Sequence, residues 1–191
     1  MNFWFFLWLL ISVVLIGFSV WTTLILIRQK QAWRKFAANN KLRYRSRSLM
    51  VSPEIHGVYQ GYPIGVFTSE HIIAEGRSER KMTAIEIEME SRMPVSGALG
   101  SKGMVPIIQT LEYSDTYQPN NAKWNVENLI RCDDKKVLEA YLTDARLEAL
   151  NRVLERKNDW GLFIFKGNDT ILRIDTPAPL EGAKDLQEIM D

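Results

Sequence analysis

Histidine and cysteine, which serve most often as zinc ligands and activated catalytic groups, are scarce in this chain. There are two histidines, His56 and His71, and one cysteine, Cys132. A hydrolytic zinc site usually takes three protein ligands, which His56, His71 and Cys132 could supply only by meeting in space. His71 and Glu75 have the i, i+4 spacing of a ligand pair on a helix, but the surrounding pattern predicts a turn between strands. We therefore expect no metal site.

The single cysteine is also a poor candidate nucleophile. Cys132 ends a predicted strand and is followed by Asp133 and Asp134, whose negative charge would raise the pKa of the thiol. The chain contains no GxSxG elbow, kinase signature, Rossmann fingerprint or calcium-binding loop. These observations predict a protein that is not an enzyme and that needs no cofactor.

A row of carboxylates occupies one face of a predicted strand. Glu86, Glu88 and Glu90 alternate with apolar residues in this segment. We interpret the row as solvated surface. The alternatives are a paired acid/base site, or a surface that attracts a basic partner.

A glycine-rich segment invites comparison with phosphate-binding loops. Gly97, Gly100 and Gly103 are spaced by three residues, and Lys102 lies among them. The order GxxxxGK[ST] is missing, and no following helix is predicted that would present its N-terminal amides. We predict instead a flexible loop over residues 91–106, the longest in the chain, of a kind that can contact partners.

The clearest element in the sequence is an apolar run near the N-terminus. Residues 3–27 contain no charged side chain. As a helix these 25 residues reach roughly 37 Å, more than the ~30 Å hydrocarbon core of a bilayer. A cleaved signal peptide would need a basic start and a shorter apolar stretch. Residues 17–19 (GFS) resemble a cleavage site, but the residues after them are still apolar. We predict a retained single transmembrane helix within residues 1–28.

The charges that follow the run predict its orientation. Lys and Arg next to a spanning helix stay on the cytoplasmic side, and no basic side chain precedes the run. We therefore predict a cell inner-membrane protein with its N-terminus outside and its C-terminal domain in the cytoplasm. A lone cysteine agrees with a reducing compartment. The basic residues are Arg28, Lys30, Arg34, Lys35, Lys41, Arg43, Arg45 and Arg47.

These eight residues are also predicted to contact anionic lipid head groups. Each charge near the membrane surface gains about 1 kcal/mol from such lipids. The surrounding segment, residues 29–50, is expected to be a juxtamembrane helix and linker, with Trp33, Phe36 and Ala37 against the membrane interface. A second interpretation is that the charges only set topology. Nucleic-acid binding is not expected, because residues 48–191 carry 23 acidic against 16 basic side chains.

One face of the spanning helix is suited to a partner helix. Ser12, Ser19 and Thr23 fall within about 40° of one another around a helix, with Ile16 and Trp8 beside them. Small and hydroxylated residues let a second helix approach closely. The alternative is that each hydroxyl bonds a carbonyl of its own helix.

The rest of the chain, residues 51–191, predicts a single α+β domain. Strands grouped before and after helices, with hairpin-length links, indicate an antiparallel sheet packed with two to three helices. Strands are predicted over residues 58–60, 64–67, 83–90, 105–113, 126–132, 161–166 and 170–175. Helices are predicted over residues 133–142, 144–157 and 181–190, with Asp133 or Asp134 and Thr143 as caps of the first two.

The chain resembles an uncharacterised family of bacterial membrane-anchored proteins. The resemblance is carried by the segments 33–37 (WRKFA), 57–61 (GVYQG) and 141–147 (YLTDARL), and by Thr83 at the opening of a strand. It covers most of the domain. It implies an N-terminal transmembrane helix and a cytoplasmic α+β domain of no assigned chemistry, and it provides no catalytic residues.

These observations lead to one functional hypothesis and one alternative. The first is a non-enzymatic accessory, assembly or scaffolding subunit of a larger membrane protein complex. The alternative is a membrane-tethered domain that binds a lipid or small ligand between sheet and helices. An apolar cavity larger than about 300 Å³ would favour the alternative.

Overall fold

The computed structural model describes residues 3–48, 51–72, 79–178 and 180–190. The chain divides into two compact units. We call Met1–Ile55 with Pro179–Asp191 the anchor unit, and His56–Ala178 the sheet unit. Each unit is described by itself.

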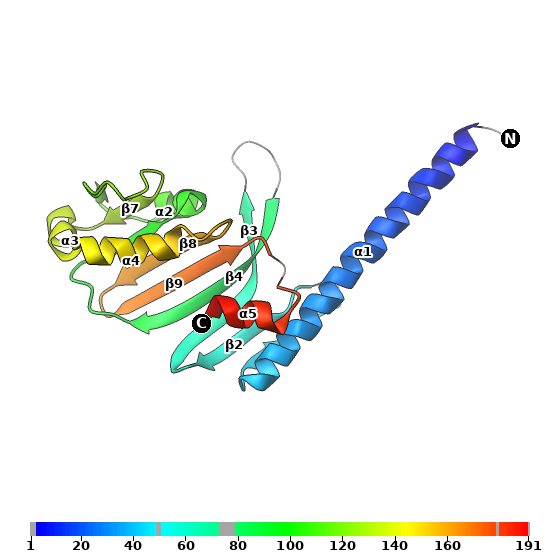
Figure 1. Ribbon diagram of the computed structural model, residues 1–191, viewed down its shortest axis with the longest axis horizontal. Coiled ribbons are helices and arrows are strands. Elements are labelled where there is room, and N and C mark those ends of the chain that lie inside the picture. The colour runs from blue at the N-terminus through cyan, green and yellow to red at the C-terminus, as the bar shows by residue number, and fades with distance from the viewer. Residues whose placement is uncertain (1–2, 49–50, 73–78, 179, 191) are drawn as a thin grey trace. The chain divides into compact units, whose positions relative to one another are not determined.

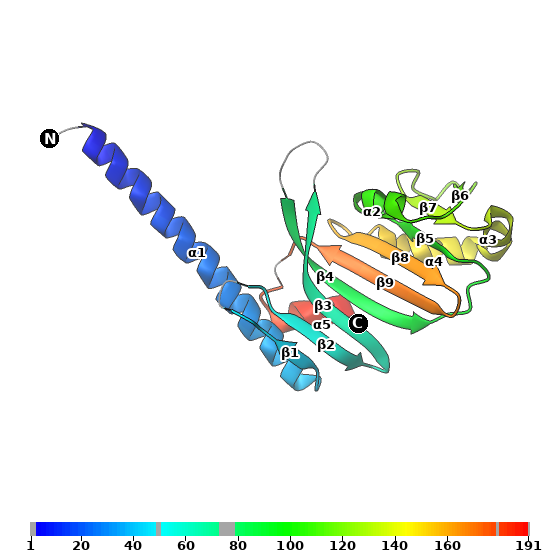
Figure 2. The same ribbon diagram turned by 180° about the vertical axis from the view of Figure 1, so that it is seen from behind.

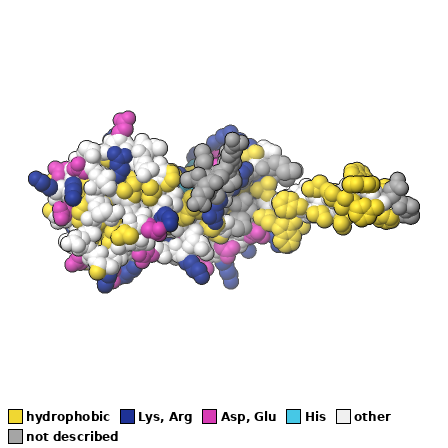
Figure 3. All heavy atoms as spheres, turned by 90° about the horizontal axis from the view of Figure 1, so that it is seen from above, with side chains coloured by type: hydrophobic (Ala, Val, Ile, Leu, Met, Phe, Trp, Pro, Cys, Tyr) yellow, Lys and Arg dark blue, Asp and Glu magenta, His cyan; other side chains and the backbone are white. Residues whose placement is uncertain are grey.

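The anchor unit is built on one long helix, α1 (Phe3–Asn39) (Figure 1). It contains no proline, and its first 25 residues are apolar on every side. Figure 3 shows hydrophobic side chains covering the N-terminal part of α1, and the mean hydropathy of its most apolar window is 2.5. The predicted helix is confirmed, and it is long and apolar enough to cross a membrane.

The second part of α1 is amphipathic, and its apolar face is buried in the protein. Trp33, Phe36 and Ala37 are each at most 1% exposed, so the prediction that they lie against the membrane interface is wrong. The helix packs against β1 (Arg43–Arg45) and α5 (Ala183–Met190), whose Leu186 is buried. The spacing that suggested an interfacial face is the same spacing that a core-facing helix requires.

The chain turns back at the end of α1. The amides of Lys41 and Leu42 donate to the carbonyls of Ala38 (3.4 Å) and Ala37 (2.8 Å), and Lys41 has φ 57°. This is a Schellman motif with lysine at the position that glycine usually occupies. Lys30 Nζ then donates to the carbonyl of Ser48, so residues 43–48 return alongside the helix (Figure 2).

The sheet unit is an antiparallel sheet with helices, which confirms the predicted α+β class. Its hairpins β3–β4 and β8–β9 and the pairs β4–β9, β5–β8, β5–β7 and β6–β7 are all antiparallel. The strand order in this unit is β2 (Glu54–Tyr59), β3 (Tyr62–Ile72), β4 (Glu79–Glu90), β9 (Asp169–Thr176), β8 (Trp160–Lys166), β5 (Gly97–Gly100), β7 (Leu129–Cys132) and β6 (Asp115–Tyr117).

Helices cover both faces of the sheet around β5. Leu99 packs in one cluster with residues of α3 (Lys135–Tyr141) and α4 (Asp144–Leu154). Its neighbour Ala98 packs in a second cluster with the 3₁₀ helix η1 (Lys102–Met104) and with α2 (Val105–Thr110). Successive strand residues point to opposite faces, so these helices lie on opposite sides of the sheet.

The predicted caps of the helical pair are partly confirmed. Asp134 accepts hydrogen bonds from the amides of Lys136 and Val137 at 2.9 and 3.1 Å, as an N-cap should. Thr143 is the N-cap residue of α4, but its side chain makes no capping bond.

Two predictions for residues 91–113 are wrong. Residues 105–110 of the strand predicted over residues 105–113 form α2, which carries Pro106 at its start, where a missing amide hydrogen costs nothing. The flexible loop predicted over residues 91–106 contains β5, a strand buried along its whole length, and η1. At Gly97 an added Cβ would lie 2.6 Å from the carbonyl oxygen of Arg131, so this glycine serves close strand packing.

Candidate functional site

The sheet unit contains a cleft with a volume of about 960 Å³. On one side the cleft is lined by η1 and α2. On the other side it is lined by the end of α4, the start of β8 and residues of the 125–128 turn. The lining residues are Glu70, His71, Arg80, Ser101, Lys102, Gly103, Pro106, Ile107, Thr110, Asn125, Asn128, Leu154, Glu155, Arg156, Asp159 and Trp160.

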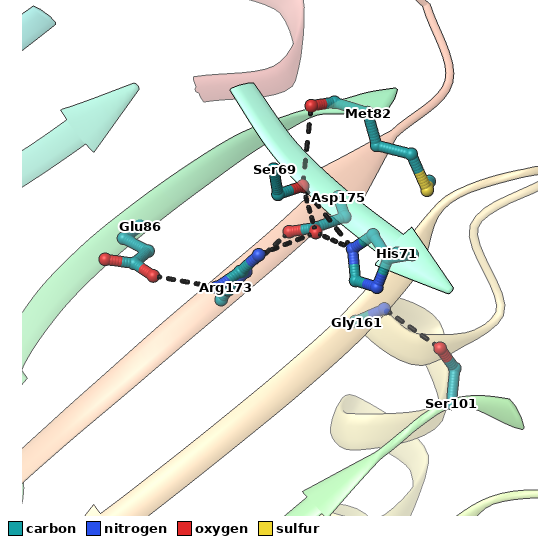
Figure 4. Close-up of polar contacts among 8 residues, drawn as sticks. All are labelled: Ser69, His71, Met82, Glu86, Ser101, Gly161, Arg173 and Asp175. Atoms are coloured by element: carbon teal, nitrogen blue, oxygen red, sulfur yellow. Dashed lines mark hydrogen bonds and ion pairs between the residues drawn. The ribbon is translucent and has the colours of Figure 1, made fainter. Parts of the chain in front are cut away.

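One wall of the cleft depends on the glycine-rich segment. An added Cβ at Gly103 would lie 2.1 Å from Cδ2 of Trp160, so the backbone of η1 rests directly on the indole. Ser101 Oγ accepts a hydrogen bond from the Gly161 amide at 3.0 Å, and the Ser101 amide donates to the Gly161 carbonyl at 2.9 Å (Figure 4). These contacts fix η1 to the start of β8.

Asn128 supplies an unused polar group in the cleft. Its backbone is held by the Asn125 carbonyl (3.0 Å) and by Gln118 Nε2 (3.1 Å). The residue is only 2% exposed, and its side-chain Nδ2 has no hydrogen-bond partner among the described residues. Buried polar groups are nearly always paired, and among the described residues that line the cleft Asn128 is the one whose buried side-chain donor has no partner.

The rim of the cleft carries charges of both signs. Arg156 and Asp159 form an ion pair at 3.5 Å, and Lys102 and Glu127 form one at 2.6 Å. Arg80 lies 5.6 Å above the ring of Trp160. Gly103 and Arg80 thus both lie against the indole, which holds Trp160 as part of the wall.

His71 belongs to a buried network of polar side chains. Its ring nitrogen Nε2 and the hydroxyl of Ser69 both hydrogen-bond to Asp175 Oδ2, the latter at 2.7 Å (Figure 4). Arg173 donates to the same carboxylate from Nε at 2.7 Å and from a terminal nitrogen at 2.9 Å, and it reaches Glu86 at 3.3 Å. These five residues join β3, β4 and β9.

The strand register explains how these side chains meet. His71 lies on β3 and Asp175 on β9, and β4 lies between those strands. Asp175 pairs with Ala84 of β4, and Ala84 pairs with Phe67 of β3. The small side chain of Ala84 leaves space for side chains from the outer strands to meet across β4.

The network positions His71 and keeps a carboxylate ionised. Burial raises the pKa of Asp175, but hydrogen bonds and charge from Arg173, with Ser69 and His71, outweigh burial, and the pKa lies below its ordinary value. The Ser69 hydroxyl donates a hydrogen bond to Asp175, and its oxygen lies 3.4 Å from His71 Nε2. Serine and histidine thus share one carboxylate oxygen, whereas a catalytic relay places the histidine between serine and carboxylate.

The residues considered above as possible metal ligands form no metal-binding group in the described part of the chain. His71 is committed to Asp175 and packs edge-on against Trp160 at 4.9 Å. Within residues 3–48, 51–72, 79–178 and 180–190, no group of three or more His, Cys, Asp and Glu side chains could hold a metal ion. Glu75 lies outside the described residues.

The predicted rise in the pKa of Cys132 is confirmed. The main cause is burial, because the residue is fully buried, and the charge of Asp115 adds to it. The charges of Asp133 and Asp134 act in the same direction, while a backbone hydrogen bond at Asp134 acts against it. A thiol in this state is a weak nucleophile at neutral pH.

The glutamate row is divided between two roles. Glu86 is half-buried and pairs with Arg173, whereas Glu88 and Glu90 are exposed. The interpretation as solvated surface thus describes two of the three residues.

One hydroxyl of the predicted docking face, that of Thr23, is directed to the helix backbone, as is the hydroxyl of the neighbouring Thr22. Thr23 Oγ1 donates to the Ser19 carbonyl at 2.8 Å, and Thr22 Oγ1 donates to the same carbonyl at 3.0 Å. A partner helix against Ser12, Ile16, Ser19 and Thr23 stays a prediction.

The chain was compared with models of protein families, with curated proteins and with solved structures, and none of them matches it. The resemblance to bacterial membrane-anchored proteins therefore stays a prediction. The cleft and its contacts are the evidence on which a function must be argued.

Proposed function

We propose that this chain is a membrane-anchored protein whose sheet unit binds a small molecule in the cleft. The observation that carries the proposal is the Asn128 amide, which is buried in the cleft wall without a partner. Leaving a buried donor unpaired costs about 1–3 kcal/mol, and a bound ligand would remove that cost.

The size and chemistry of the cleft support a small polar ligand. Binding sites for small molecules commonly enclose about 300–1,000 Å³ and contain a few placed polar groups among apolar ones. Here Ile107, Pro106 and Leu154 are apolar, and the side-chain Nδ2 of Asn128 is a donor. The ligand should therefore present an acceptor oxygen or nitrogen to Asn128 and apolar surface to α2.

The variant Asn128→Leu tests this function. Leucine is close in shape to asparagine but has no donor, so the ligand-free variant should be more stable by about 1–3 kcal/mol and should no longer bind. The full-length protein is purified from native membranes in mild detergent, and the small molecules that co-purify are identified by mass spectrometry. Asn120→Leu, at an exposed position, is the control.

The two possible outcomes are distinct. A compound present in wild type and Asn120→Leu preparations, absent from Asn128→Leu, and able to raise the melting temperature of wild type only, supports the proposal. Identical small-molecule content in all three preparations, with unchanged stability of Asn128→Leu, contradicts it.

We also propose that α1 spans the cell inner membrane with its N-terminus outside. The support is an uncharged helix followed by eight basic residues before any acidic one. The buried Cys132 allows labelling at a chosen site, because it reacts poorly. A cysteine introduced at exposed Lys157 should react with a membrane-impermeant maleimide only after the cells are opened; labelling of intact cells would reverse the orientation.

A further inference from the structure

A second cleft, of about 420 Å³, lies within the anchor unit directly after the apolar part of α1. One wall is a single face of α1, formed by Arg28, Gln31, Ala32 and Lys35, at i, i+3, i+4 and i+7. The other wall is the segment 181–185 that leads into α5. The two walls belong to elements that contact each other, α1 and α5, and Leu186 of α5 is buried.

The acidic side chains in this cleft have partners within the described part of the chain, whereas two of its lysines do not. Glu181 pairs with Arg28 at 3.9 Å. Asp185 accepts a hydrogen bond from the Gly182 amide at 2.9 Å, which caps the start of α5. Among the described residues, neither Lys35 nor Lys184 has an ion pair or hydrogen-bond partner. The carboxylates of Glu181 and Asp185 therefore already interact within the protein, whereas the ammonium groups of Lys35 and Lys184 can bind an anion.

The depth of the cleft indicates which anion it meets. Arg28 follows the last residue of the apolar run, and Lys35 lies about 10 Å further along the helix. The head-group layer on each side of a bilayer is roughly 5–8 Å thick. With α1 across the bilayer, the Arg28 end of the cleft thus lies at the depth of the lipid phosphates. Helix side chains are directed toward the helix N-terminus, so the side chain of Lys35 extends back toward that depth.

We propose that this cleft binds the phosphate of a phospholipid head group, with Lys35 and Lys184 as the binding cations. The Arg28–Glu181 pair links the 181–185 segment to α1 at the edge of the cleft. Ammonium-to-phosphate hydrogen bonds are charge-assisted and stronger than neutral ones. Through this site α5 would contact the membrane as well. This contact adds to the electrostatic attraction between the basic residues 28–47 and anionic lipids. The inference rests on the proposed membrane anchoring.

Native mass spectrometry of the full-length protein, released from nanodiscs of defined phospholipids, tests the site. Wild type should retain one phospholipid per chain. The double variant Lys35→Ala/Lys184→Ala should retain at least tenfold less, because both cations are gone. The variant Arg34→Ala/Lys166→Ala removes the same charge from exposed positions outside the cleft and should behave as wild type. Lys35→Arg/Lys184→Arg should also retain the lipid.

Each other outcome overturns the inference. Equal retention by both alanine variants means that lipid is held by general charge and not by the cleft. Loss of the lipid on addition of millimolar inorganic phosphate, with phosphate bound in its place, identifies a site for the free anion. Failure of all variants to enter nanodiscs removes the anchoring itself, and is thus distinguished from failure of the cleft alone.

Discussion

Asp175 requires more compensating interactions than an exposed carboxylate, because it is fully buried and its lowered pKa keeps it ionised. Its two oxygens receive hydrogen bonds from Arg173, Ser69 and His71. A buried charge is tolerable only when it is paired in this way, and removal of one partner leaves the other uncompensated. The same carboxylate fixes the ring of His71 in the wall of the cleft.

The variant Asp175→Asn should therefore be destabilised by about 3 kcal/mol, because Arg173 loses its main counter-ion. The pKa of Asp175 is lower in the folded than in the unfolded protein, so the unfolded chain takes up its proton first as the pH falls. The contribution of Asp175 is complete at neutral pH and is lost as the pH falls below about 4.

Urea denaturation of the full-length protein in detergent, from pH 7 to pH 3, measures both effects. Wild type should lose stability in the acid range more steeply than Asp175→Asn. Equal acid sensitivity of the two proteins would show that the carboxylate is not ionised in the folded state.

Gly103 is a second residue whose role depends on one contact. Alanine at this position would place a methyl group against the indole of Trp160, so Gly103→Ala should lower the free energy of unfolding by about 1–3 kcal/mol and should weaken ligand binding in the cleft. Gly17→Ala is the control, because nothing lies within 4 Å of the added Cβ. A Gly103→Ala protein as stable as the Gly17→Ala protein would contradict the described packing.

At the scale of elements, the end of α1 makes a prediction of its own. Lys41 occupies the left-handed position of a Schellman motif, a conformation that raises the energy of an L-residue with a side chain. Lys41→Gly should stabilise the protein by about 0.5–1 kcal/mol in thermal denaturation, although glycine loses more entropy on folding. Lys157→Gly, near the end of α4, should not stabilise it. A destabilised Lys41→Gly protein would show that the motif is not formed.

Elements with a clear local signal could be predicted from the sequence. Alternation of apolar and acidic residues predicted β4, and an aspartate before a helical pattern predicted α3 with its cap. The helix α2 was missed because its six residues include Val105, Ile107 and Ile108, which favour strands, and because so short a helix shows no full period. Pro106 was the available signal.

The candidate site could not be predicted, for a different reason. Asn128 is a polar residue in a turn, and only the packing of distant segments buries it. His71 and Asp175 meet across an intervening strand although 104 residues separate them in sequence. Neither relation leaves a local pattern. The glycine spacing is visible in the sequence, but the close packing of η1 on Trp160 that it serves depends on a contact 57 residues away.

At the scale of the whole molecule, the hypothesis of an accessory or scaffolding subunit leads to a separate prediction. If a partner helix packs on α1, leucine at Ser12, Ser19 and Thr23 should reduce the recovery of partner proteins in detergent pull-downs by several-fold, because bulkier residues prevent close approach. Leucine at Val13, Val14 and Val20 is the matched control. Unchanged recovery would remove this face of the helix from the hypothesis.

The membrane location of α1 is the claim on which the orientation and the lipid site both depend. Its most direct test is the distribution of the full-length protein between membrane pellet and supernatant after an alkaline carbonate wash. We expect wild type in the pellet, and we expect Val14→Arg/Ile16→Arg in the supernatant, because each arginine at the middle of a spanning helix costs about 2.5–3.5 kcal/mol. Wild-type protein released into the supernatant would contradict the account.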